Sequence, residues 1–369
     1  MNITQGYKQT ELGIIPEDWE VKPIGECLSI GNGCDYKDKP FGNIPVYGTG
    51  GVITYINDYL YDGQTICIGR KGTINKPLYY EGKIWTVDTL YYTYNFIDVD
   101  VKYIYYLLMT IDWMSLNEAT GVPSLTSDRI RHILLALPPV AEQRAIAEAL
   151  SDIDGLIAAL DKKIAKKRLI KQGAMQQLLT GKKRLPGFSG PWMERKLGAI
   201  SHIKTGSCNG DQAVDNGKYP FFVRSQKVYA IDSYSYDGEA ILVPGEGGIG
   251  SIFHYINGKF DYHQRVYKIS DFADNVCGKY IFFYMSRYFG EYALSLTVKA
   301  TVDSLRLPTF EEFVICMPLN IEEQQAIATI LNDMDKEIDD LEAQRDKYRL
   351  LKSGMMQKLL TGQIRLKIK

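Results

Sequence analysis

Apolar residues recur at an alternating spacing of four and three residues in two stretches of the chain. Each stretch predicts a long helix with a single apolar stripe, because this spacing is the a/d seam of a coiled coil. Two helices that each carry one such stripe most simply pack against each other. The predicted seam consists of Ile146, Leu150, Ile153, Ile157 and Leu160 in the first stretch and of Ile327, Leu331, Met334, Ile338 and Leu341 in the second.

The two helical stretches are copies of one sequence. Residues 142–185 align without a gap onto residues 323–366 at a constant offset of 181, with 23 of 44 positions identical. Both copies close on Thr-Gly, at residues 180–181 and 361–362, and glycine is the usual residue just past a helix C-terminus. We therefore expect two helices of about 35–40 residues, each roughly 55–60 Å long at 1.5 Å per residue.

Outside these stretches the pattern changes to short alternating apolar runs, such as QTICIG at 64–69 and EAILVP at 239–244. Such runs, bounded by turn residues, predict strands. These regions are faint copies of each other as well, since motifs such as YDG at 61–63 and 236–238 recur in order at a near-constant offset. We therefore predict an α+β protein with an internal pseudo-two-fold repeat, in which two long helices separate two α/β globules. The expected boundaries are 1–136 and 186–316 for the globules, and 137–185 and 317–369 for the helical spacers.

Composition adds little to this picture. The 369 residues are 45% hydrophobic, with a formal net charge of −1, which does not by itself indicate a nucleic-acid binder. A basic run at 161–184, with nine basic residues and one acid, permits DNA binding without arguing for it. The six cysteines contain no CxxC pair, so we interpret them as reduced thiols. A polar N-terminus without an apolar signal core leads us to expect a cytoplasmic protein.

The chain contains no convincing motif for covalent chemistry. Residues 245–250 (GEGGIG) satisfy GxGxxG, but the following SIFHYINGKF predicts a strand and not the helix that a dinucleotide site requires. The phosphate-binding GxxxxGK[ST] loop and the Asn/Asp-Pro-Pro-aromatic tetrapeptide of DNA methyltransferases are both missing, and the four histidines lack metal-ligand spacing. We therefore predict a non-catalytic chain with no metal site and no cofactor of its own.

Polar and basic residues on glycine-rich loops are the better functional candidates. Arg, Lys and Gln read guanine and adenine edges in the major groove, while Ser, Thr and Lys hold phosphates. Two such sets occupy corresponding parts of the two globules, and we propose them as DNA-binding candidates on chemical grounds. They are Lys37, Lys39, Tyr47, Thr49, Arg70, Lys71, Thr73, Ser124, Thr126 and Arg129 in the first globule, and Arg224, Gln226, Lys227, His263, Gln264, Arg265, Lys299 and Thr301 in the second.

The order of globules and helices resembles the specificity subunit of type I restriction-modification enzymes. The motifs that carry the resemblance are EQRAIA with MQQLLTG in the first helix and EQQAIA with MQKLLTG in the second. The openings GIIPEDWEVKPIG at 13–25 and FSGPWMERKLG at 188–198 are similar to the starts of the two target recognition domains of that family. The resemblance covers essentially the whole chain.

This resemblance implies that each globule reads one half of a bipartite double-stranded DNA target. It implies that the two helices pack antiparallel, set the spacer and dock two methyltransferase (modification) subunits. S-adenosylmethionine, ATP and Mg are then expected in the modification and restriction subunits and not in this chain. Because helices of roughly 55–60 Å exceed one turn of B-DNA, about 34 Å, the two half-sites should be separated by an unspecified spacer.

Three questions stay open at the level of sequence. The modification partner could be a separate subunit or part of a fused restriction–modification enzyme. A different class of function is a coiled-coil scaffold whose globules bind protein or another ligand and not DNA. Exposed helix surfaces meant for partners could also pair two copies of the isolated chain.

Overall fold

The computed structural model describes residues 5–296 and 304–366. The chain divides into two compact units, of which unit 1 takes residues up to Asp161 and from Gln344 on, and unit 2 takes Lys162–Ala343. The two long helices, α4 (Val140–Leu178) and α8 (Ile321–Leu359), contribute to both units. Each unit therefore holds one globule, the beginning of the helix that follows it, and the end of the other helix.

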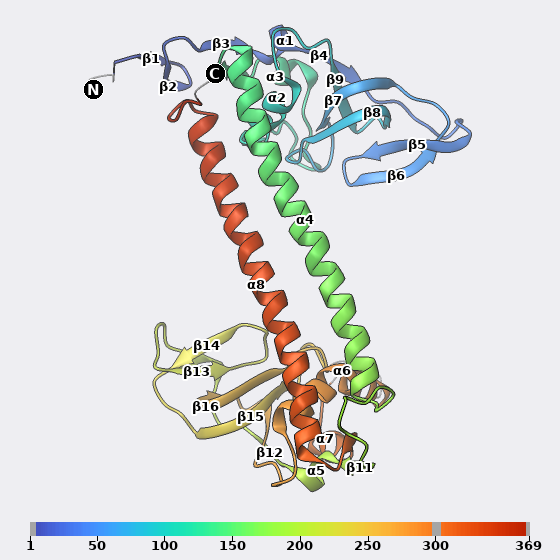
Figure 1. Ribbon diagram of the computed structural model, residues 1–369. Helices are drawn as coiled ribbons and strands as arrows, with labels where there is room; N and C mark the ends of the chain where they lie inside the picture. The colour runs from blue at the N-terminus through green and yellow to red at the C-terminus, as the bar shows by residue number, and fades with distance from the viewer. Residues whose placement is uncertain (1–4, 297–303, 367–369) are drawn as a thin grey trace. The chain divides into compact units, whose positions relative to one another are not determined.

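Unit 1 is built around a six-stranded sheet of order β4-β9-β7-β8-β5-β6, in which β5 and β8 run parallel and the other neighbours antiparallel (Figure 1). Strands β3 and β10 form a separate antiparallel pair beside the start of α4. Its elements are β1 (Tyr7–Thr10), β2 (Gly13–Pro16), β3 (Glu20–Pro23), α1 (Ile24–Cys27), β4 (Ser29–Asn32), β5 (Phe41–Gly48), β6 (Gly51–Ile56), β7 (Tyr61–Gly69), β8 (Leu78–Thr86), β9 (Leu90–Tyr94), α2 (Val101–Leu108), α3 (Ser127–Arg131) and β10 (Leu134–Leu137).

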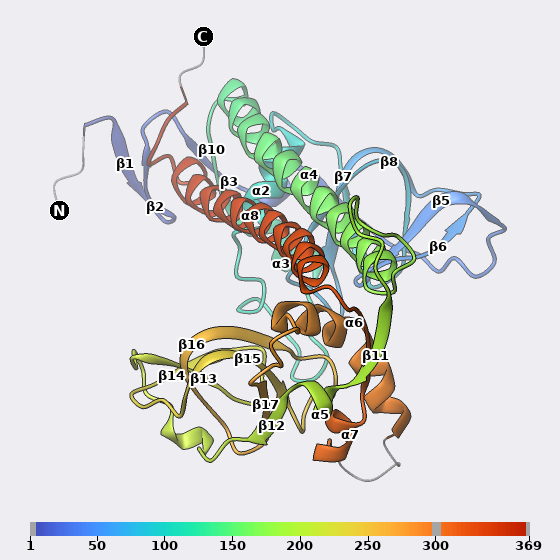
Figure 2. The same ribbon diagram turned by 60° about the horizontal axis from the view of Figure 1, so that its bottom comes forward.

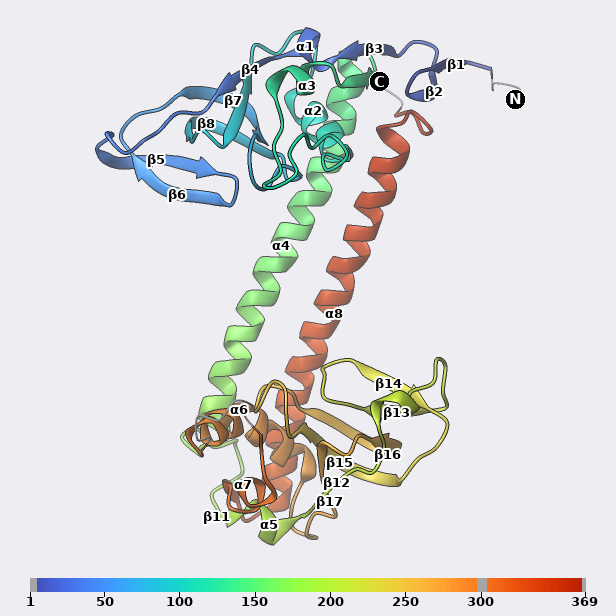
Figure 3. The same cartoon turned by 180° about the vertical axis from the view of Figure 1, so that it is seen from behind.

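Unit 2 repeats this topology with a sheet of order β12-β17-β15-β16-β13-β14, in which β13 and β16 run parallel (Figures 2 and 3). Strands β11 and β18 form the separate antiparallel pair. Its elements are β11 (Trp192–Lys196), α5 (Leu197–Ile200), β12 (His202–Thr205), the 3-10 turn η1 (Gly210–Gln212), β13 (Tyr219–Phe222), β14 (Val228–Ile231), β15 (Tyr236–Pro244), β16 (His254–Tyr262), β17 (Val266–Ser270), α6 (Gly278–Leu296), α7 (Leu307–Glu311) and β18 (Val314–Pro318).

The two globules share tertiary contacts as well as strand order. The hydroxyl of Tyr103 at the start of α2 donates to the Ala136 carbonyl at 3.0 Å, and that of Tyr280 at the start of α6 donates to the Cys316 carbonyl at 2.8 Å. Both tyrosines are fully buried. The predicted α+β class with two globules, two long antiparallel helices and an internal repeat is confirmed.

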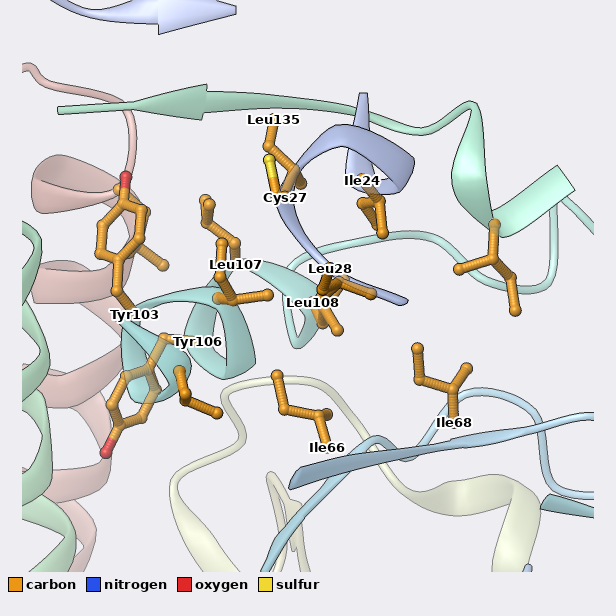
Figure 4. Close-up of a cluster of buried hydrophobic side chains, with 14 of the residues drawn as sticks. Ile24, Cys27, Leu28, Ile66, Ile68, Tyr103, Tyr106, Leu107, Leu108 and Leu135 are labelled. Carbon is orange, nitrogen blue, oxygen red and sulfur yellow. The ribbon is translucent and has the colours of Figure 1, made fainter. Parts of the chain in front are cut away.

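The main core of unit 1 lies between the sheet, α2 and the helix pair (Figure 4). Ile66 and Ile68 from β7 lie on one side of this cluster, and Ile24 and Leu135 lie on the opposite side. Leu28, with Leu107 and Leu108 from α2, lies between them. Ile146 and Leu150 from the start of α4 and Leu359 and Leu360 from the end of α8 belong to the same cluster. The ends of both helices are thus part of the globular core.

Unit 2 has the corresponding core. It gathers Ile327 and Leu331 from the start of α8 with Leu178 and Leu179 at the end of α4, against Ile241 of β15 and the aromatic residues of α6. The ten predicted seam residues are all buried or half-buried. The first two residues of the first seam and the first three of the second pack into a globule, so only the later ones belong to a coiled coil in the strict sense.

Ion pairs between the helices run in opposite chain directions. In unit 1, Asp154 pairs with Lys352 at 2.7 Å and Asp161 with Arg345 at 3.5 Å. In unit 2, Lys167 pairs with Glu337 at 2.6 Å, and Lys171 pairs with Asp335. As the residue number rises along α4, that of its partner falls along α8, which establishes the antiparallel arrangement within each unit.

A buried glutamate at the start of each long helix binds an arginine that follows the end of the other helix; we call this arrangement the clasp. In unit 1, Glu142 accepts from Arg365 at 2.6 and 2.7 Å, and Trp19 Nε1 lies 3.4 Å from the same carboxylate. In unit 2, Glu323 accepts from Arg184 at 2.6 and 2.7 Å, and the guanidinium lies over the Trp192 ring. Both glutamate side chains are 1% exposed.

The residue after each glutamate ties the helix start to its globule. Gln143 donates to the Pro138 carbonyl and accepts from the Asp100 amide, both at 2.9 Å. Gln324 donates to the Pro318 carbonyl at 2.9 Å and accepts from the Cys277 amide at 2.8 Å. Because buried amides must be hydrogen-bonded, these contacts fix the orientation of each helix where it leaves its globule.

A turn after the C-terminal end of each long helix brings the clasp arginine back toward its glutamate. Gly181 and Gly362 adopt φ values of 68° and 70°, a left-handed conformation that glycine adopts without steric cost. The next backbone bonds, Lys183 N to Gln177 O and Ile364 N to Lys358 O, are both 3.2 Å. These helix endings turn the chain back, so that Arg184 and Arg365 meet their glutamates.

We predict that leucines on the same helix differ strongly in their contribution to stability. Leu331→Ala should lower the free energy of unfolding by about 2–5 kcal/mol, because Leu331 is fully buried in the core of unit 2. Leu350→Ala, at a residue that is 76% exposed, should change it by no more than about 0.5 kcal/mol. Chemical denaturation of both variants measures the difference, and equal losses would contradict this assignment of the core.

Candidate nucleic-acid interface

Three loops of unit 1 are joined by backbone hydrogen bonds at the carboxyl end of β7. The Arg70 and Lys71 amides donate to the Thr89 carbonyl at 2.8 and 3.2 Å. The Leu125 amide donates to the Arg70 carbonyl at 2.9 Å, and Lys71 forms an isolated antiparallel bridge with Ser124. The loops after β7, before β9 and before α3 thus form one surface, which we call loop cluster 1.

Loop cluster 1 carries exposed cations. The Arg70 guanidinium donates to the Asp88 carbonyl at 3.3 Å and lies 5.9 Å from the centre of the Tyr91 ring. Arg129 pairs with Glu118 at 3.4 Å. The hydroxyl of Thr126 caps α3 by accepting from the Arg129 amide. The structure brings the following candidates together here: Thr49, Arg70, Lys71, Thr73, Ser124, Thr126 and Arg129.

Unit 2 forms the equivalent surface, loop cluster 2, with two of these backbone bonds and the same bridge. The Gly245 amide donates to the Arg265 carbonyl and the Leu305 amide to the Gly245 carbonyl, both at 2.8 Å, and Glu246 bridges Ser304. By this pattern Gly245 corresponds to Arg70, Glu246 to Lys71 and Arg265 to Thr89. The side chains therefore differ in charge at equivalent backbone positions.

In loop cluster 2 the Glu246 carboxylate lies between two arginines. One oxygen accepts from Arg265 at 2.9 Å and the other from Arg224 at 3.3 Å. Gln264 donates to Asn209 at 2.7 Å on the neighbouring loop. A cavity of about 480 Å³ opens beside these groups, lined by Thr205, Gly245, Glu246, Gln264, Arg265, Tyr267, Ser304, Leu305 and Arg306.

His263 is a candidate whose ring the fold encloses. It is 8% exposed, and its Nδ1 accepts from the Arg265 amide at 2.9 Å. Burial lowers the pKa of the imidazole, and the nearby Arg224 and Arg265 guanidinium groups lower it further. The ring supports the loop that presents Arg265 and does not itself face solvent.

Five of the remaining candidates lie outside both loop clusters. Lys37 pairs with Asp35, and Lys39 pairs with Asp58 at 3.0 Å and lies over the Trp85 ring, toward the opposite end of β5. Tyr47 packs edge-on against Tyr80, and burial raises its pKa. Gln226 lines a separate cleft, and Lys227 covers the Tyr229 ring. Lys299 and Thr301 lie outside the described residues.

Sequence reasoning missed four members of the clusters: two acids, one amide and one arginine. Glu118, Asn209, Glu246 and Arg306 were not among the candidates, although each adjoins one that was. The candidates were chosen as cationic or neutral hydrogen-bonding side chains on loops, and this rule excludes carboxylates. The only available signal for Glu246 was its position directly after a strand, in a glycine-rich loop with Arg224 and Arg265 elsewhere in the same globule.

The GxGxxG segment at 245–250 connects two antiparallel strands, β15 and β16. Its last glycine has a structural purpose, because a Cβ on Gly250 would lie 2.4 Å from Cα of Gly290 in α6. Its φ of 65° also favours glycine. Glycine here allows the loop to pack closely against α6.

A family model of the type I restriction modification DNA specificity domain matches residues 16–167 and 190–348. The chain belongs to this family. Each matched copy begins at a globule and continues into the long helix that follows it. The chain therefore carries two specificity domains, and the resemblance to type I specificity subunits is confirmed.

Similar proteins span the full length of the chain. It is 26% identical to the putative type I restriction enzyme MjaX specificity subunit and 25% identical to the MjaVIII specificity subunit, both of Methanocaldococcus jannaschii. Each alignment covers 98% of this chain and 97% of the relative. The fold is similar to the crystal structure of a type I restriction-modification S subunit from M. genitalium, with a TM-score of 0.75, 13% identity, and coverage of 100% and 99%.

Two further observations bear on the chemistry of these specificity domains. Within residues 5–296 and 304–366, histidine, cysteine and carboxylate side chains form no group of three or more that could hold a metal ion. In the same part of the chain, every helix is too short or too polar to cross a bilayer.

We predict that His263 makes stability depend on pH. Its folded-state pKa lies below the ordinary value of 6.5, so the unfolded chain takes up the proton first as pH falls. The stability present at neutral pH is therefore lost as pH falls through about 6.5. His263→Gln should flatten the decline in melting temperature between about pH 7.5 and 5, measured by calorimetry; an unchanged slope would show that the buried ring has no such effect.

Proposed function

We propose that this chain is the DNA-reading subunit of a type I restriction-modification complex, in which each unit recognises one half of a bipartite double-stranded target. The observation that carries the proposal is the pair of loop clusters. They rest on shared backbone hydrogen bonds and present different charged groups. Two equivalent surfaces with different side chains suit the recognition of two different half-sites, because base edges are read by side-chain donors and acceptors.

The long helices suit a spacing role. Each contains 39 residues and is therefore about 58 Å long. The clasp and the buried glutamines hold a helix end in each globule. We propose that this construction sets the number of unspecified base pairs between the half-sites, since its length exceeds one turn of B-DNA, about 34 Å.

The helices also carry an apolar surface suited to a protein partner. Leu169 and Leu350, which are equivalent in the repeat, are 69% and 76% exposed, and the adjacent Ile170 and Leu351 are 47% and 50% exposed. Large apolar side chains that recur at equivalent exposed positions favour docking of the same kind of partner twice. We propose two methyltransferase (modification) subunits as these partners, together with a restriction subunit.

The catalytic chemistry belongs to those partners in this proposal. S-adenosylmethionine would be bound by the modification subunits, and ATP and Mg by the motor and nuclease machinery. This chain would contribute target recognition and assembly. A cytoplasmic location follows from that role.

We predict that Arg70 affects one half-site only. In the complex with its modification subunits, Arg70→Ala should weaken binding of the target roughly tenfold and relax base selectivity in one half-site. Lys83→Ala is the matched control, because Lys83 pairs in register with Asp62 at the other end of β7 and covers the Tyr59 ring. Mobility shifts across a salt series with single-position target variants provide the measurement.

The target sequence needed for these assays is determined by mapping methylated adenines in the host genome. Wild-type binding that is insensitive to both sequence and salt would overturn DNA reading and favour a protein-binding scaffold. Equal effects of Arg70→Ala and Lys83→Ala on target binding would show that loop cluster 1 is not part of the DNA interface.

We predict that a charge on the exposed apolar surface blocks assembly. Leu169→Glu combined with Leu350→Glu should abolish co-purification of the modification subunits while leaving the melting temperature nearly unchanged, since both residues are exposed. Thr329→Glu, which adds the same charge at an exposed residue about 32 Å along α8, should leave assembly intact. Light scattering gives the stoichiometry, and normal complexes from the double variant would contradict this docking surface.

A further inference from the structure

The carboxylate of Glu246 is the most specific difference between the two loop clusters. Its backbone position corresponds to Lys71 in unit 1, so an acid replaces a base at one point of an otherwise shared loop framework. An acid on a surface that meets DNA is unfavourable near phosphates, because both carry negative charge. Electrostatic attraction to DNA therefore does not explain why this position carries an acid.

The geometry points to positioning. Glu246 is 22% exposed, whereas Arg224 and Arg265 are 50% and 59% exposed. Each arginine uses Nη1 to bind one carboxylate oxygen, and in the described part of the chain these are the hydrogen bonds formed by the two guanidinium groups. The carboxylate is therefore less exposed than the two guanidinium groups that it binds, and it limits the directions in which they point.

We propose that Glu246 is a specificity-determining positioning residue, which holds Arg224 and Arg265 as donors for guanine edges in the half-site read by unit 2. This inference rests on the proposed DNA-reading function. Arginine forms bidentate hydrogen bonds with guanine O6 and N7, and this pairing is the commonest specific contact in the major groove. An arginine that is held in advance loses less side-chain entropy on binding, and its fixed direction favours one base over others.

The contrast with unit 1 sharpens the inference. Lys71 has a flexible stem and a compact charge that suits a phosphate, and Arg70 is held by a backbone carbonyl and not by a carboxylate. The equivalent of Arg265 in unit 1 is Thr89, which has no charge. Unit 2 should therefore depend on G·C pairs at the positions its arginines reach, and unit 1 should lack this dependence on an acidic residue.

The test uses the full complex with its modification subunits and DNA duplexes that carry the mapped target with each base pair changed in turn. Glu246→Gln should reduce discrimination roughly tenfold at one or two G·C pairs, in the half-site that Arg70→Ala leaves unaffected. Affinity for a non-cognate duplex of the same length should stay equal or rise, because a negative charge has been removed. A merely structural role would lower binding to both duplexes alike.

Two further variants complete the test. Arg265→Lys keeps the charge but loses the planar fork, and should relax the same positions. Glu312→Gln removes a carboxylate from another exposed ion pair of unit 2, with Lys196, and should leave discrimination unchanged.

The outcomes distinguish failure of the role of Glu246 from failure of the proposed DNA-reading function. Wild-type discrimination by Glu246→Gln, relaxation at A·T pairs, or relaxation in the other half-site would each overturn the role of Glu246 while leaving DNA reading intact. A wild-type complex that binds target and non-cognate duplexes equally would overturn the proposed function itself.

Discussion

A glutamate side chain at the start of each long helix is buried away from water, and the rest of the architecture depends on the partner that its carboxylate binds. Burying a carboxylate charge costs several kcal/mol unless a partner with good geometry is supplied. The partner is an arginine that follows the end of the other long helix, Arg365 for Glu142 and Arg184 for Glu323. Neither globule is complete until both helices are in place, and the helices must run antiparallel to bring these ends together.

This requirement changes how the internal repeat is understood. Similarity between the two helices suggests a common partner, yet many of the shared residues face inward. Glu142, Gln143, Ile146 and Leu150 and their repeats serve the clasp and the globular cores. Leu169 and its repeat Leu350 are also shared but exposed. Structural necessity explains most of the first group, and only the second group points to a partner.

The same separation of roles applies to the globules. Their strand order, their pair of buried tyrosines and the backbone bonds of their loop clusters are shared. The side chains carried by those loops are not, as Lys71 and Glu246 illustrate. A framework of backbone hydrogen bonds tolerates such exchanges because the bonds do not involve the side chains. Recognition can therefore change in one unit without disturbing the fold or the other unit.

Much of this structure could be predicted from the sequence. The seam spacing predicted the helices, because a period close to 3.5 can be read without knowing the partner. The Thr-Gly endings predicted where they stop, and the faint motif repeats predicted two related globules. Cations on loops were identified by type, and Arg70, Lys71, Arg224 and Arg265 lie in the loop clusters. Lys37 and Lys39, chosen by the same rule, pair with aspartates elsewhere.

By itself the sequence determined the elements that local spacing controls: two long helices, their ends, the repeat and the family. The tertiary structure alone decided which distant residues meet, since strand order, the clasp and the grouping of Arg224, Glu246 and Arg265 all join segments far apart in the chain. Burial and charge pairing select these contacts by their sum over the whole fold. No local pattern records that sum, which is why an acidic residue between two arginines became visible only in three dimensions.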